Sequence, residues 1–124
     1  ISYNPLGGGG LLTGKHDRAN PQAGSQFTQA DGQGDRYLER YWLDQLHDTV
    51  DAIRPLAAEA GMSMAQLSVA WVFANPAVTA PIIGATAPAQ LDDALGAVES
   101  GLDADLKAAL DDLATQYRVS DAAG

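Results

Sequence analysis

Near its N-terminus the chain combines an aromatic residue, a glycine run and a lysine. Tyr3 is followed by the glycines at 7–10 and then by Lys15. Successive glycines leave backbone N–H groups unobstructed by side chains, so that an anion can approach them closely. A lysine ammonium adds a compact positive charge. This order of residues is typical of a site that holds a flat ring and its phosphates, although a glycine run is also typical of a flexible loop.

The composition limits the classes of function. Of the 124 residues, 46% are hydrophobic and 19% are charged, as in globular domains that form a core. The 16 acidic residues outnumber the 7 basic ones and give a net charge of −9, which argues against nucleic acid as a partner. The sequence has no cysteine, no long apolar run and no signal peptide. We therefore expect no disulfide, no membrane partner and a cytoplasmic location.

The first part of the chain predicts a short strand and a long loop. Residues 1–3 are typical of the end of a strand, because Pro5 blocks further ladder hydrogen bonds. Polar residues and glycine dominate residues 17–34. We expect this stretch to be a long, mobile loop with few apolar anchors beyond Phe27.

A long helix is expected next. It should begin near Asp35 or Arg36 and end at Gly61 as its C-cap. Pro55 lies inside the pattern and is expected to kink or divide the helix, because proline removes a hydrogen bond and clashes with the preceding turn. Helical spacing predicts one buried stripe, formed by Leu38, Trp42, Leu46, Val50 and Ile53.

The middle of the chain predicts a second helix and a second strand. Ser63 and Gln66 have the spacing of a capping box, and Asn75 with Pro76 should end the helix that follows. Residues 78–83 are apolar and β-branched without polar alternation. This pattern favours a buried parallel strand.

Two more helices are expected after this strand. One should begin at Ala87 or Pro88 and run through Val98. The other should be capped by Asp103 and lined by Leu106, Leu110 and Leu113. The alternation of strands and helices indicates an α/β fold, with residues 1–124 as a single unit.

Two stretches of the sequence resemble the aldo-keto reductase family. Residues 2–15 resemble its seventh strand and the following loop, and residues 81–91 resemble its eighth strand and the turn into the last barrel helix. Residues 36–42 and 61–71 match the intervening helices in order. The branch it resembles contains aflatoxin-aldehyde reductases and potassium-channel β subunits. The resemblance implies a helix-rich α/β fold, the C-terminal portion of a (β/α)8 TIM barrel comprising its last two strand-helix units.

The resemblance also implies that this chain lacks the catalytic residues. A complete barrel needs about 250 residues, and the family's tetrad of aspartate, tyrosine, lysine and histidine lies on earlier strands. The implied function is part of an NAD(P)H-dependent aldo-keto reductase that reduces aldehydes or ketones to alcohols by hydride transfer. The alternative is a truncated relative without redox activity, which acts as a binding or assembly module or as a redeployed non-redox enzyme.

For the first motif the resemblance implies contacts with the nicotinamide and the pyrophosphate. Tyr3 would stack on the nicotinamide ring; otherwise it is a strand tyrosine packed in the barrel. Asn4, Leu6 and the glycines, Gly8 among them, would contact the pyrophosphate through backbone amides. Lys15 would supply a cation for the same phosphates; without the resemblance it is a surface lysine.

For the second motif the resemblance implies contacts with the adenosine half of the cofactor. Gly84 would allow close approach of the cofactor, and Thr86 would bind the 2′-phosphate, although a plain N-cap explains Thr86 equally well. Gln90 would reach the adenine ribose or the phosphate region. Asp93 would lie beside the adenine.

Three departures from the family pattern affect the cofactor. Ala94 replaces an asparagine that hydrogen-bonds adenine, Ala87 occupies a position that is often lysine or arginine, and Gln26 stands where an arginine commonly clamps the 2′-phosphate. Each lost charge-assisted contact costs roughly 1.5–3 kcal/mol. We expect binding of NADP(H) to be weakened, shifted toward NAD(H), or lost. The expected partners are a small-molecule carbonyl substrate and either a second copy of the chain or the missing barrel portion.

The two histidines do not predict a separate active site. His47 is expected to be a half-buried surface residue, and His16 follows the glycine loop without a carboxylate partner at a suggestive spacing. No cluster with metal-ligand spacing is evident, so we expect no metal site.

Overall fold

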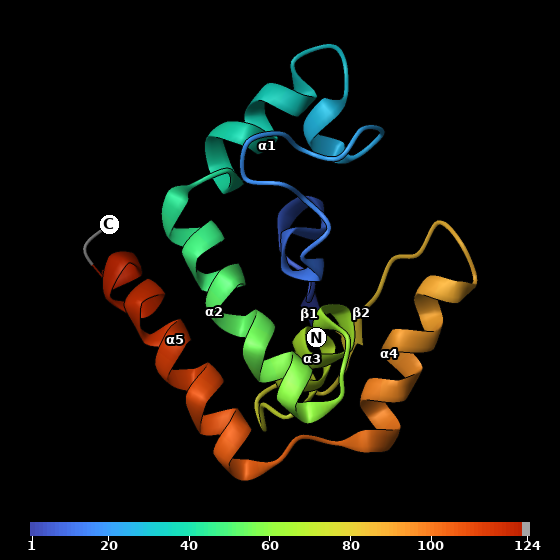
Figure 1. Cartoon of the computed structure of the whole chain (residues 1–124), viewed down its shortest axis with the longest axis vertical. Helices are drawn as coiled ribbons and strands as arrows, with labels where there is room; N and C mark the ends of the chain where they lie inside the picture. The colour runs from blue at the N-terminus through green and yellow to red at the C-terminus, as the bar shows by residue number, and fades with distance from the viewer. Residues whose placement is uncertain (123–124) are drawn as a thin grey trace.

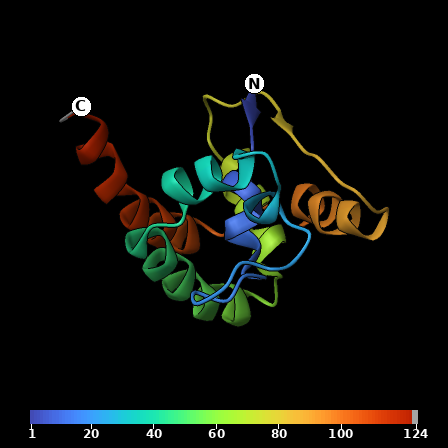
Figure 2. The same ribbon diagram turned by 90° about the horizontal axis from the view of Figure 1, so that it is seen from above.

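Two short strands pair in parallel (Figure 1), and the view from above in Figure 2 places them at the rim of the fold. The computed structural model describes residues 1–122 and the side chains up to Tyr117. In it, β1 (Ser2–Tyr3) pairs with β2 (Pro81–Ile82) in parallel, with Tyr3 opposite Ile82. The parallel pairing is as predicted. Strand β2 is shorter than the predicted residues 78–83. The prediction that this strand is buried is wrong, because Ile82 is 57% exposed and no described element covers its side chain.

Helices surround the strand pair on several sides. In Figures 1 and 2 the helix α3 lies behind the strands, α2 and α5 run together on one side, and α4 lies on the other. Between the strands the chain forms the 3₁₀ helices η1 (Gly8–Thr13) and η2 (Gln26–Thr28) and the helices α1 (Gln33–Tyr41), α2 (Asp44–Ala60) and α3 (Met64–Phe73). After β2 come α4 (Ala89–Ser100) and α5 (Ala104–Ala122). The fold is a helix-rich α/β arrangement with a small parallel sheet, in agreement with the expected class.

Helix α3 is the central element of the core. Leu67 is fully buried, and Val69 and Ala70 are almost so. Leu67 packs against α2 and α5, whereas Val69 and Ala70 pack against α4. The helix therefore joins two apolar clusters, one on each side. The first contains Ile53, Ala57, Leu67 and Leu110, and the second contains Val69, Ala70, Ala94 and Ala97.

The predicted cap of α3 is present in part. The Ser63 hydroxyl accepts a hydrogen bond from the Gln66 backbone N–H at 3.0 Å, as a capping box requires. The Gln66 side chain does not return to Ser63 but donates to Ser100 at the end of α4. At the start of α5, the Asp103 carboxylate accepts from the backbone N–H of Asp105, as predicted for a cap.

The helix expected around Pro55 is broken at a different place. The chain leaves α1 at Trp42, whose ψ of 59° is not helical, and α2 begins at Asp44. Pro55 lies inside α2, which continues to Ala60 and is capped by Gly61. The prediction that Pro55 divides the helix is therefore wrong, and a kink at Pro55 stays a prediction. Pro55 is exposed, and its missing N–H removes one hydrogen bond of a helix that is held by burial of its opposite face.

Residues 17–34 contain more regular structure than expected. The short helix η2 lies within them, and α1 begins at Gln33, ahead of the predicted start at Asp35. Phe27 is only 3% exposed, which agrees with its expected role as an anchor. The mobility of the remaining loop stays a prediction.

Within residues 1–122, no single helix is long and apolar enough to cross a bilayer. The pair of α2 and α3 passes the same test of length and composition when the two are taken together, but they are bent by 92° at their junction.

Leu67→Ala tests the central position of α3. Removing a fully buried leucine leaves a cavity and should lower the free energy of unfolding by about 2–5 kcal/mol, measured by urea denaturation. Leu95→Ala is the matched control, because Leu95 is 62% exposed on α4. It should change the same quantity by less than about 0.5 kcal/mol. Equal losses in the two variants would contradict the central role of α3.

Candidate functional site

The two predicted motifs meet where the parallel strands end. Because β1 and β2 run in the same direction, Asn4 and Ile83 leave the sheet at the same edge. The glycine loop follows from one strand, and Gly84 and Thr86 follow from the other. Ligands of open parallel sheets bind outside the carboxyl ends of the strands. The strand pair thus brings together two segments that are about eighty residues apart in the sequence.

Tyr3 and its neighbours present both ring surface and backbone at this edge. The Tyr3 side chain is 75% exposed. Asn4 has a left-handed backbone with φ of 55°, and its carbonyl accepts from the Gly7 N–H at 3.0 Å, so the chain turns sharply after the strand. The Leu6 side chain packs against the cluster of α3 and α4. A contact between the Leu6 backbone and the pyrophosphate stays a prediction.

The glycine loop is shaped by two aromatic rings. Gly8 is buried, and a Cβ on it would overlap the ring of Tyr41. Gly9 has φ of 67°, and a Cβ there would overlap the ring of Phe27. These two glycines are therefore required by close packing against the rings, whatever else the loop binds. A pyrophosphate contact of Gly8 stays a prediction and would have to use the side of the loop away from Tyr41.

Lys15 lies beside the glycine loop. Its side chain is exposed, and its ammonium nitrogen is 3.3 Å from the position that a Cβ of Gly10 would occupy. The backbone N–H of Lys15 approaches the Thr13 hydroxyl, which itself donates to the Gly10 carbonyl at 2.7 Å. The loop thus carries a positive charge on its outer surface, where an anion could reach it.

His16 fastens the glycine loop to the segment that follows it. The Gln22 backbone N–H donates to the His16 Nδ1 at 3.0 Å, so Nε2 carries the proton and donates to the Gly9 carbonyl at 3.0 Å. The bond from Gln22 needs the neutral ring, because a protonated Nδ1 cannot accept a hydrogen bond, whereas the bond to Gly9 is compatible with either form. Burial lowers the pKa of His16, and the nearby Lys15 and His47 lower it further, against an opposing effect of the bond to Gly9.

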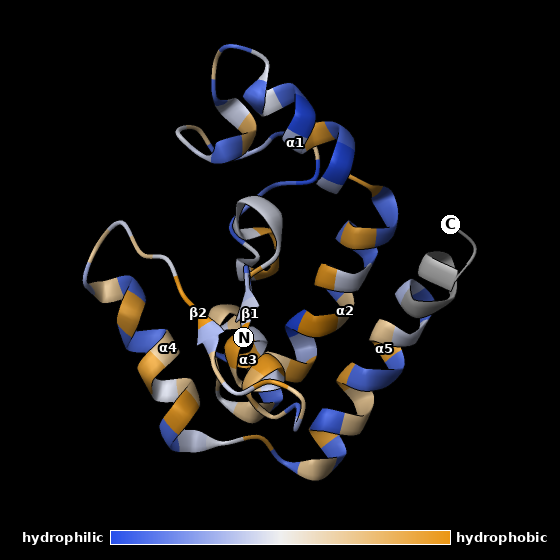
Figure 3. Cartoon of the chain, turned by 180° about the vertical axis from the view of Figure 1, so that it is seen from behind, coloured by the Kyte–Doolittle hydropathy of each residue, from blue (hydrophilic) through white to orange (hydrophobic). Residues whose placement is uncertain are grey.

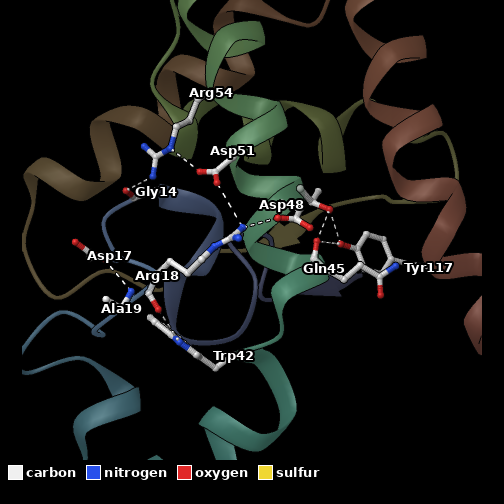
Figure 4. A network of polar contacts seen from close by, with 11 residues as sticks. Gly14, Asp17, Arg18, Ala19, Trp42, Gln45, Asp48, Asp51, Arg54 and Tyr117 are labelled. Carbon is white, nitrogen blue, oxygen red and sulfur yellow. Dashed lines mark hydrogen bonds and ion pairs between the residues drawn. The ribbon is translucent and has the colours of Figure 1, made fainter.

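An exposed polar network ties the same segment to α2 (Figure 4). Arg18 forms an ion pair with Asp48 at 2.6 Å, and Arg54 donates to the Gly14 carbonyl at 3.0 Å. The Trp42 indole N–H donates to the Arg18 carbonyl. The residues after the glycine loop are therefore held on α2 by contacts that solvent can compete for.

The second motif is held together by side-chain hydrogen bonds. The amide oxygen of Gln90 accepts from the Thr86 backbone N–H at 2.8 Å, so Gln90 closes the turn before α4. Pro88 is the N-cap of α4, and the N-cap alternative for Thr86 is therefore wrong. Asp93 accepts from the Ser63 hydroxyl at 2.9 Å and links α4 to the start of α3. Gly84 has open space where a Cβ would lie.

Comparison of the sequence with known protein families gives one match over most of the chain. The sequence profile of the Aldo/keto reductase family matches residues 1–115. The chain belongs to the aldo/keto reductase family. This agrees with the resemblance seen in the strand-end motifs.

Several curated proteins are similar to this aldo/keto reductase chain. A probable voltage-gated potassium channel subunit beta of Oryza sativa subsp. japonica is 34% identical over 98 residues, which are 79% of this chain and 29% of that protein. An uncharacterized oxidoreductase of Bacillus subtilis is 35% identical over 114 residues, or 91% and 31% of the two chains. The L-glyceraldehyde 3-phosphate reductase of Escherichia coli is 30% identical over 101 residues, which are 81% of this chain and 28% of that protein. The chain thus spans less than a third of the length of these relatives.

The sequence did not predict the aromatic cluster around the glycine loop. Phe27 and Trp42 lie with their ring centroids 4.9 Å apart, and both His16 and His47 pack their ring edges against Trp42. His47 is buried, not half-exposed as predicted, because Trp42 covers it. The available signal was the concentration of aromatic residues between 27 and 42. Among the described residues of this aldo/keto reductase chain, no group of three or more histidine or acidic side chains is arranged to hold a metal ion.

Gly9→Ala tests the packing of the glycine loop on Phe27. Gly32→Ala is the matched control, because Gly32 has a similar φ of 75° but open space around a Cβ. Both variants carry the cost of a left-handed alanine. Gly9→Ala should lose about 1–3 kcal/mol more free energy of unfolding in urea, from the overlap with Phe27. Equal losses would show that the ring moves aside freely.

The pH dependence of stability tests the bonds of His16. Folding lowers the pKa of His16 below 6.5, so the unfolded chain binds the proton more tightly. The contribution of His16 to stability is complete above the unfolded pKa and is lost as the pH falls below it toward the folded pKa. An NMR titration of the His16 ring should give a pKa below 6.5. His16→Gln should reduce the loss of stability between about pH 7.5 and about pH 5.5; an unchanged loss would contradict this assignment.

Proposed function

We propose that this chain is the cofactor-binding C-terminal part of an NAD(P)H-dependent aldo-keto reductase, equivalent to the last two strand-helix units of a (β/α)8 barrel. The observation that carries the proposal is the meeting of the glycine loop and the Gly84–Thr86 turn at the carboxyl ends of two paired parallel strands. The membership of the family over residues 1–115 supports it. The substrate would be a small aldehyde or ketone, and the location cytoplasmic.

The residues at the strand edge fit a nicotinamide dinucleotide. The exposed ring of Tyr3 offers a flat apolar surface for the nicotinamide, and Lys15 offers its charge to the pyrophosphate. The open space at Gly84 admits a ligand close to the backbone, and Gln90 holds the Thr86 turn in one shape. When bound, the cofactor would supply hydride for transfer to a carbonyl carbon. The role of this chain is then to bind and orient the dinucleotide, with proton transfer assigned to residues outside it.

The charge pattern favours a cofactor site with little choice between NADPH and NADH. The pyrophosphate is common to both molecules, and only the 2′-phosphate distinguishes them. Gln26 is exposed and uncharged, and Ala87 offers no side-chain donor. Since neither residue provides a cation, the 2′-phosphate of NADPH gains little binding free energy over the 2′-hydroxyl of NADH.

Calorimetric titration of the protein with both cofactors tests this proposal. The two dissociation constants should differ by less than about tenfold, or 1.4 kcal/mol. Lys15→Ala should weaken both by roughly tenfold, because it removes a cation that contacts the shared pyrophosphate. Lys107→Ala is the control, because Lys107 is paired with Asp111 on α5. Strong preference for NADPH would contradict the 2′-phosphate argument, and no binding of either cofactor would contradict the proposed function.

The second candidate is a binding or assembly module without redox activity. It is favoured by the exposed apolar side chains of α4, where Leu91, Leu95 and Val98 are each more than 40% exposed. Figure 3 shows hydrophobic residues recurring along the ribbon of this helix. Such an apolar surface on a helix normally packs against another element. We propose that it is covered either by a second copy of the chain or by the rest of a barrel. A compact monomer in sedimentation, with no signal from a dye that binds exposed apolar surface, would contradict this candidate.

A further inference from the structure

An apolar cavity lies on the inner side of the glycine loop. Its volume is about 280 Å³, and α2, α3, α5 and the loop itself form its walls, with one side open to solvent. Gly7 and Gly8 form one wall together with Tyr41. None of the cofactor-site side chains Tyr3, Lys15 or Thr86 lines it, so it is separate from the strand-edge site. The remaining apolar wall consists mainly of Leu46, Ile53, Leu67, Trp71, Leu110 and Leu113.

The polar groups around this cavity are already hydrogen-bonded. The Thr49 hydroxyl and the Tyr117 hydroxyl contact each other at 2.5 Å, and each reaches the Gln45 carbonyl. The Ser68 hydroxyl donates to the Met64 carbonyl within its own helix at 2.8 Å. A buried water needs two to four polar partners, and these groups have their bonds satisfied within the protein. The cavity therefore favours an apolar occupant over water.

The lining also selects the chemistry of the occupant. No charged residue is among the described lining residues, so a charged ligand would lose its hydration without compensation. Three aromatic side chains, Tyr41, Trp71 and Tyr117, line the cavity and can pack edge-to-face against another ring. The Trp71 ring is fixed by its indole N–H, which donates to Asp111 at 2.8 Å. An apolar cavity of about 150 Å³ is already large enough to bind benzene.

We propose that this cavity is a binding site for one small, uncharged aromatic molecule. The site is independent of the proposed cofactor function, since it shares with that site only the backbone of the glycine loop. The occupant would lie between α2 and α5 and would contact Trp71 directly. Trp42, the second tryptophan, packs in the aromatic cluster with Phe27 and is not part of the lining.

Bromobenzene is a suitable probe, because its heavy atom quenches the fluorescence of an indole that it contacts. In Trp42→Phe, where Trp71 is the remaining tryptophan, emission should fall along a saturating curve as bromobenzene is added. Benzene should reverse the loss by competition. In Trp71→Phe, emission from Trp42 should show only weak quenching that rises linearly with concentration. Linear quenching in both variants would overturn the proposal.

Filling the cavity provides the second arm of the test. Ala114 lines the cavity from α5, whereas Ala108 is exposed on the same helix. In the Trp42→Phe background, Ala114→Phe should weaken bromobenzene binding by about tenfold or more, and Ala108→Phe should leave it unchanged. Circular dichroism checks that each variant is folded. If Ala114→Phe does not fold, Leu46→Phe replaces it as the variant that fills the cavity. Equal bromobenzene binding in the Ala114→Phe and Ala108→Phe variants would contradict the proposed site. A protein that sediments as a dimer and binds no bromobenzene would contradict it as well.

Discussion

The parallel pairing of Ser2–Tyr3 with Pro81–Ile82 is the constraint on which the other features depend. Parallel strands cannot be joined by a tight turn, so the chain between them must cross over the sheet. That crossing contains α1, α2 and α3, and it returns the second strand in register beside the first. The two segments that follow the strands are consequently brought to one edge. The packing of Leu6 and Ile83 against the cluster of α3 and α4 supports the same arrangement of the glycine loop and the Thr86 turn.

Helix α3 makes the pairing stable although the sheet itself is small. Two residues per strand provide few ladder bonds, and the exposure of Ile82 shows that little apolar area is buried on that side. The burial is provided instead by four consecutive residues of α3, from Leu67 to Ala70. Because these residues point in different directions around the helix, α3 contacts α2 and α5 on one side and α4 on the other. A helix that is buried nearly all round fixes the elements on each side of it.

The glycine loop illustrates how one segment meets two demands. On its inner side, Gly8 and Gly9 admit the rings of Tyr41 and Phe27, which leaves no room for a Cβ. On its outer side, Lys15 presents a charge to solvent. His16 holds the loop by two hydrogen bonds, and the one that it accepts from Gln22 exists only for a neutral ring, which burial favours. The shape of the loop is therefore set by packing and hydrogen bonds before any ligand is present.

Features that depend on local chemistry can be predicted from the order of the residues. The Ser63 cap, the Gly61 end of α2 and the strand after Asn75 follow from propensities of neighbouring residues, and the family motifs are recognisable from their order alone. The tertiary structure decided where packing overrides those propensities. The break at Trp42 rather than at Pro55 arises because Trp42 packs into an aromatic cluster, whereas Pro55 lies on an exposed face. The burial of His47, the partners of His16 and the cavity behind the glycine loop involve residues far apart in the sequence, and no local pattern specifies such contacts.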